Sequence, residues 1–138
     1  MNRTICACEK CVECCKRQPG PLAPGDFERI AGFLRQSPET AKMLFQASKG
    51  CVARLRDGRV IRIGTITPKR KKTDGSCVFL DRDNRCMIHP VAPFGCAYFD
   101  MHMGKHEADR RAAVLAIRQA SDPEYQKLRD ELKEKECE

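Results

Sequence analysis

The sequence predicts an α+β fold: a small single metal-stabilised domain with short β-hairpins, two N-terminal helices and a C-terminal helical segment. The chain has 138 residues, which suits one domain spanning 1–138. Ten residues are cysteine, whereas six Phe, two Tyr and no Trp leave few large side chains for a core. Apolar residues recur at helical spacing near both ends of the chain and alternate between them. Metal ligands are therefore expected to supplement a thin core.

The first half of the chain predicts a loop, two helices and a hairpin. Residues 1–20 are expected to form a cysteine-rich loop, since they lead into a Pro-Gly-Pro turn. Apolar residues three and four apart predict a helix over 26–34, and a Ser-Pro-Glu start predicts a second helix over 37–50. The segment 51–66 alternates around Asp57-Gly58, which is typical of a β-hairpin.

The second half predicts a smaller hairpin followed by helices. The hairpin is expected over 77–88, and two prolines make 89–100 irregular. Residues 104–136 form the C-terminal helical extension, in which Ser121-Asp122-Pro123 is typical of a break between two helices. No internal repeat or domain linker is visible, so all these elements belong to one domain.

Composition narrows the compartment and the partners. Charged residues make up 33% of the chain and no apolar run approaches the ~18 residues of a membrane span, so we expect no membrane partner. The N-terminus lacks the apolar stretch of a secretory signal, which favours a cytoplasmic protein. In that reducing compartment, closely spaced cysteines indicate metal or redox chemistry more than disulfides.

The positive charge is concentrated in one segment. Eight of the 26 basic residues and one of the 19 acidic residues lie within 54–72, so this segment carries the whole formal net charge of +7. Such a segment can contact nucleic acid or an acidic protein, or it can be a solvated hairpin and turn. It contains no aromatic residue that could stack on bases, which disfavours a single-stranded nucleic acid.

The sharpest motif is Cys8-x2-Cys11-x2-Cys14-Cys15. A C-x2-C step lets two thiolates reach one ion, because the backbone amides between them fold back toward the sulfurs. Adjacent side chains of an extended segment point to opposite sides, so Cys14 and Cys15 could serve two sites, or one of them could simply pack.

Three more cysteines lie around the second hairpin: Cys77, Cys86 and Cys96. Pairing of that hairpin would bring Cys77 and Cys86 close together, and Cys96 follows in the next loop. We therefore expect the N-terminal loop and this hairpin to clamp a common metal centre. The alternative is that these three cysteines are small core residues.

These cysteine blocks, together with the Asp26-led helix, resemble the CxxCxxCC, or YkgJ-type, cysteine-cluster family, which is described as chelating zinc or iron. The resemblance covers residues 8–99, which we take as the metal-chelating core, and one family member is a flagellin lysine N-methylase. It implies seven metal ligands: Cys8, Cys11, Cys14, Cys15, Cys77, Cys86 and Cys96. The chain departs from the family at Ala92 and Ala97, where arginine is usual, and at His89, where an aromatic residue is usual.

Several further residues could join the metal site. Cys6 is close enough in sequence to be an eighth ligand, and His89 lies between two cysteines of the motif. His102 and His106 are four apart, but Gly104 between them argues against a helical metal pair, so an exposed helix N-terminus explains them more simply. The remaining cysteines, outside the family pattern, are Cys51 and Cys137.

The sequence leaves the metal open. Seven thiolates exceed the need of one tetrahedral zinc, so one alternative is zinc, with one or two ions. The other is an iron–sulfur cluster on four cysteines, which the closely spaced cysteine run slightly favours.

These patterns predict a cysteine-rich metal-binding protein with an accessory or metal-handling role. One alternative is a metal-dependent protein lysine methyltransferase-like enzyme; another is a metal-stabilised nucleic-acid-binding module that uses segment 54–72. The chain has no Gly-rich cofactor loop after a strand and no evident Ser/His/Asp constellation, so the sequence identifies no catalytic residue.

Overall fold

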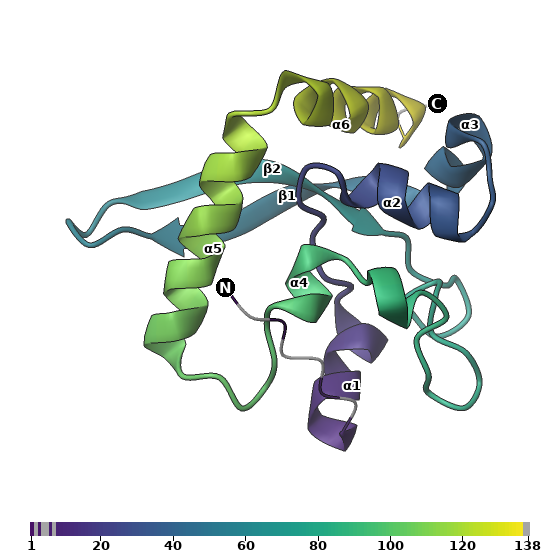
Figure 1. The fold of residues 1–138 in the computed structure, drawn as a ribbon, viewed down its shortest axis with the longest axis horizontal. Coiled ribbons are helices and arrows are strands. Elements are labelled where there is room, and N and C mark those ends of the chain that lie inside the picture. Colours follow the sequence, from purple (N-terminus) through teal and green to yellow (C-terminus); the bar gives the residue numbers. More distant parts are fainter. Residues whose placement is uncertain (2, 4–5, 7, 137–138) are drawn as a thin grey trace.

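A computed structural model describes residues 1, 3, 6 and 8–136 and confirms the α+β class. Helices surround one antiparallel hairpin, with a long helix crossing it and a shorter cysteine-bearing helix at the opposite side of the molecule (Figure 1). The elements in chain order are α1 (Glu9–Arg17), α2 (Asp26–Phe33), α3 (Pro38–Ala41), η1 (Lys42–Leu44), β1 (Phe45–Arg54), β2 (Val60–Pro68), η2 (His89–Val91), α4 (Phe94–Ala97), α5 (Lys105–Ala120) and α6 (Pro123–Glu136).

The first helix corrects the prediction of a loop over 1–20, which is wrong for residues 9–17. Steps of three and four residues between cysteines fit a metal loop, but they equally fit the 3.6-residue period of an α-helix. The charges agree with the helix dipole, because Glu9 lies in the first turn and Lys16 and Arg17 in the last. Helix α1 contains no fully buried residue.

The central hairpin is confirmed around Asp57-Gly58, where Gly58 adopts a positive φ of 88° that suits glycine. Strand β1, however, starts at Phe45, and the helix predicted over 37–50 is wrong beyond Ala41 and the single η1 turn. Ser37 does cap α3, because its side chain accepts a hydrogen bond from the Thr40 backbone N–H.

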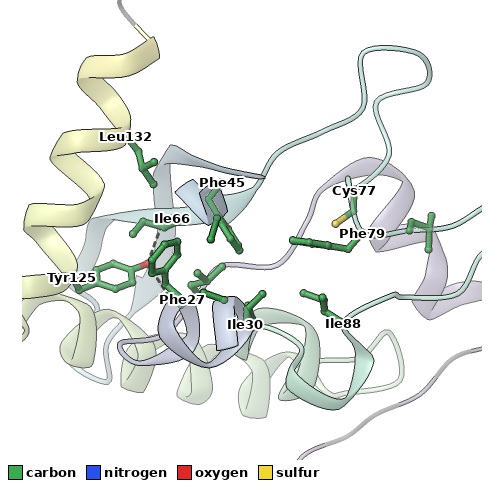
Figure 2. Close-up of a cluster of buried hydrophobic side chains, with 13 residues drawn as sticks. Phe27, Ile30, Phe45, Ile66, Cys77, Phe79, Ile88, Tyr125 and Leu132 are labelled. Carbon is green, nitrogen blue, oxygen red and sulfur yellow. Dashed lines mark hydrogen bonds between the residues drawn. The ribbon is translucent and has the colours of Figure 1, made fainter. Parts of the chain in front are cut away.

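Phe45 explains why the strand begins early. Its ring is buried between Phe27 and Phe79, with ring centroids 5.5 Å and 5.7 Å away (Figure 2). An extended backbone lets Phe45 reach this core while its neighbours pair with β2. Tertiary packing therefore overrides the helical pattern of the sequence before it.

Helices α5 and α6 pack on the hairpin, and a buried polar network fixes them there. The Tyr125 hydroxyl accepts a hydrogen bond from the Ile66 N–H at 2.9 Å and donates one to the Leu22 carbonyl at 2.7 Å (Figure 2). Gln119 donates to Thr65 Oγ1 at 2.6 Å. The predicted break at residues 121–123 separates α5 from α6, as the helix bounds show.

The second hairpin, expected over 77–88, is reduced to an isolated bridge between Leu80 and Cys86. A turn still forms, since the Asp81 N–H donates to the Arg85 carbonyl at 2.9 Å. The segment packs its apolar residues singly into the core, and this irregular path replaces regular strands.

A buried carboxylate joins this irregular segment to α2. Asp26 Oδ2 accepts hydrogen bonds from the backbone N–H of Ala23 and of Phe94, each at 2.8 Å, and Asp26 Oδ1 pairs with Arg29. Burial raises the pKa of Asp26, and these two hydrogen bonds oppose that rise. Asp26 therefore fixes the start of α4 against the start of α2.

Among the helices described, none is both long and apolar enough to cross a membrane.

Candidate metal centre

Four side chains with metal-binding atoms meet at the N-terminal end of α1. We name the set the outer group, and in it every ligand atom lies within 4.8 Å of every other: Cys6, Cys8, Cys11 and His102. Cys8 Sγ is 3.2 Å from His102 Nε2. Cys8 stands at the N-cap of α1 and Cys11 one turn later, while His102 comes from the loop between α4 and α5.

The sulfurs of the outer group differ in acidity. The backbone N–H of Cys11 and then the side chain of His102 lower the pKa of Cys8 to about 6, so Cys8 is a thiolate at neutral pH. Burial raises the pKa of Cys11 to about 11, and the neighbouring thiols Cys6 and Cys8 add to that rise. The first effect is the amide-to-sulfur interaction expected of a C-x2-C step.

The loop that carries His102 is held at several points. The His102 N–H donates to Asp100 Oδ1 at 2.9 Å, and the Arg111 side chain on α5 donates to the Tyr98 carbonyl at 2.8 Å. Met101 in the same loop lies against α1, with its Sδ 3.3 Å from Cys14 Sγ. The loop is therefore anchored to both α5 and α1, which keeps the imidazole beside Cys8.

Only part of this arrangement could be read from the sequence. Cys8 and Cys11 were expected as ligands, and Cys6 was an open eighth candidate; all three are in the outer group. His102 was assigned to an exposed helix end and was missed. The signal was its spacing from His106, but the partner of His102 is Cys8 on α1, which helical spacing could not reveal.

The remaining described cysteines of the motif lie deeper in the fold, except Cys14. We name them the inner group: Cys15, Cys77, Cys86 and Cys96. Cys77 is buried and the other three are half-buried, whereas Cys14 is exposed beside Met101. None of the described cysteines is in a disulfide. The side chain of Cys51 and all of Cys137 fall outside the described part of the chain, and His89 is exposed and not in the outer group.

The basic segment 54–72 spans the tip of the central hairpin, the strand β2 and the turn that follows. The tip projects beyond α5 (Figure 1). Several of its cations bind within the chain: Arg59 pairs with Asp57 at 2.6 Å, Arg70 donates to the Gly75 carbonyl, and Lys71 donates to the Leu80 carbonyl. These internal contacts are typical of a solvated hairpin and turn.

Comparison with known proteins fits this donor chemistry. No curated protein and no solved structure matches the chain. One family model does match, CxxCxxCC, described as "Putative zinc- or iron-chelating domain", and it covers residues 7–137. Thiolate and imidazole ligands suit both metals in that description. Because the match spans nearly the whole chain and its cysteines converge, this protein belongs to the CxxCxxCC family of zinc- or iron-chelating domains.

Proposed function

We propose that this protein binds one zinc or iron ion through the outer group and serves as an accessory, metal-handling protein. The observation that carries the proposal is the meeting of Cys6, Cys8, Cys11 and His102 within 4.8 Å. Three thiolates and one imidazole are a donor set found in four-coordinate zinc sites. Four protein ligands fill a tetrahedral shell and leave no open position for a substrate, which favours binding over catalysis.

Exposure of the site supports a handling role. Cys6, Cys8 and His102 are all exposed, so an ion held there can exchange with a partner or with small thiols. Cys8, with a pKa of about 6, offers a thiolate before the ion arrives. Cys11 has to lose its proton on binding, because its pKa is near 11, so the affinity should rise with pH.

Cobalt(II) titration of the reduced protein tests this proposal, with metal content measured as the protein is purified. His102→Ala should weaken binding at this site by at least about tenfold, since even indirect disturbance of a metal ligand costs that much. His106→Ala is the matched control, because it removes a nearby histidine that is absent from the outer group. Equal binding by the two variants would overturn the assignment of His102.

A further inference from the structure

The inner group brings four cysteines together from three separate segments. Cys15 lies in the last turns of α1, Cys77 and Cys86 flank the irregular turn, and Cys96 lies in α4. The Cys77 N–H donates to the Cys15 carbonyl at 2.7 Å, which joins α1 to the turn. Cys15 and Cys86 also pack against the core cluster that contains Cys77.

The backbone near Cys96 is shaped around its sulfur. A Cβ atom at Gly20 would lie 2.6 Å from Cys96 Sγ, so only glycine lets the chain pass this close. The Gly95 N–H donates to the Pro21 carbonyl at 2.8 Å and holds the two segments side by side. The approach of residues 20–21 therefore fixes Cys96 relative to the end of α1.

We propose that Cys15, Cys77, Cys86 and Cys96 bind a second metal centre through four thiolates, separate from the outer group and structural in role. This inference goes beyond the proposed function, which concerns only the exposed site. It also replaces the expected common centre with two: the motif's first two cysteines serve one centre and its last cysteine serves the other.

Mutual interactions of the four thiols support this centre. Burial raises the pKa of Cys77 to about 11, and nearby thiolates at Cys15 and Cys86 raise it further. The pKa of Cys96 is raised by burial and then by Cys15, Cys77 and Cys86, while Cys86 also raises the pKa of Cys15. Each pair within the inner group therefore interacts, which a set of unrelated core thiols would not require.

Backbone amides near these sulfurs favour the thiolate form. Phe79, Ile88 and Gly20 contribute backbone hydrogen bonds that lower the pKa of Cys77, Cys86 and Cys96, respectively. Donors directed at sulfur stabilise a bound thiolate more than a thiol. The backbone is thus arranged for four negative sulfurs, whose charge a metal would neutralise.

The two groups are separated along α1. Cys11 and Cys15 are four residues apart, which is about 6 Å along the helix axis. Cys11 joins the outer group, whereas Cys15 joins Cys77 through its carbonyl. Between them, Cys14 faces Met101. Among the described residues, the set within 4.8 Å contains none of the four inner cysteines.

A purely thiolate donor set selects zinc or an iron–sulfur cluster over magnesium or calcium. No three of the inner sulfurs lie within 4.8 Å of one another, so they are spread more widely than the outer ligands. One zinc would draw them together, while a cluster would bind each sulfur to a different iron. Both are four-thiolate centres, and metal analysis distinguishes them.

The test measures zinc, iron and acid-labile sulfide per chain in the anaerobically purified full-length protein, with X-ray absorption at the metal edge. His102→Ala should remove the outer metal and leave a folded protein whose remaining metal has only sulfur ligands. Cys86→Ser should remove that sulfur-only centre, and Cys14→Ser is the control that keeps both. Zinc without sulfide, or iron with sulfide, would each support the inner centre.

The proposal would be overturned by a folded His102→Ala protein that contains no metal, or by one centre lost equally in all three variants. If Cys86→Ser does not fold, the ligand shell of the His102→Ala protein decides, because nitrogen or oxygen ligands there would exclude four thiolates. Full retention of metal by His102→Ala would contradict the outer site alone, so the two proposals fail separately.

Discussion

The two ends of this molecule are stabilised by different means. Around the central hairpin, large apolar side chains such as Phe27, Phe45 and Ile66 are almost fully buried. At the other end, α1 has no buried residue and is joined to the body by the Cys15–Cys77 backbone hydrogen bond and by partial packing. The difference teaches that the cysteine-bearing end lacks the burial needed for independent stability, so bound metal has to supply it.

Removal of metal should give the largest effect and should divide the two ends. A structural zinc site contributes on the order of 10 kcal/mol, so chelation should expose the amides of α1 and of the 77–97 segment to exchange. The β1–β2 ladder should exchange much less, since its stability comes from apolar burial. Hydrogen exchange with and without a chelator measures this, and equal deprotection at both ends would refute the comparison.

Phe45→Ala should give the next largest effect, at the apolar end. Removal of a buried Phe costs about 3–5 kcal/mol, because the lost burial and the remaining cavity add. Phe33→Ala is the matched control, because Phe33 is 45% exposed, and it should change stability little. Urea unfolding of the metal-loaded proteins measures both. A Phe45→Ala loss no larger than that of Phe33→Ala would contradict the core assigned here.

The smallest effect is expected at the start of α5, where the two ends meet. Hydrogen bonds from Arg110 and then from Arg111 lower the pKa of Glu107 to about 2. Because the folded pKa lies below the unfolded value of about 4.5, the Glu107 carboxylate stabilises the fold above pH 4.5, and this contribution is lost as the pH falls toward 2.

Glu107→Gln should therefore be less stable than the parent protein near pH 6 and should approach it near pH 3. Comparing the two proteins at each pH removes effects that they share, such as metal release in acid. A stability difference that does not change with pH would show that the carboxylate charge at Glu107 is not the cause.

Local signals in the sequence were enough for much of the fold. The Asp57-Gly58 turn, the Ser37 cap and the break before Pro123 each act through the backbone of a few residues, so a single segment reveals them. The start of β1 at Phe45 was missed because it depends on rings from two other segments.

The candidate site shows the same division. Cys8 and Cys11 announce themselves by spacing, but His102 and Met101 reach α1 from a loop about ninety residues later. The α1 helix was missed because its cysteine spacing satisfies a metal loop and a helix alike. Spacing therefore identified ligand types, while the assignment of each ligand to a centre needed the three-dimensional arrangement.

The carboxylate of Asp26 also has a consequence for the order of assembly. It accepts one N–H from three residues away, at Ala23, and another from 68 residues away, at Phe94. The first contact can form as soon as the segment is synthesised, whereas the second must close a long loop. Cys96 follows Phe94 by two residues, so this same closure delivers it. We therefore expect a growing chain to meet metal with its early cysteines while its later ligands are still unmade.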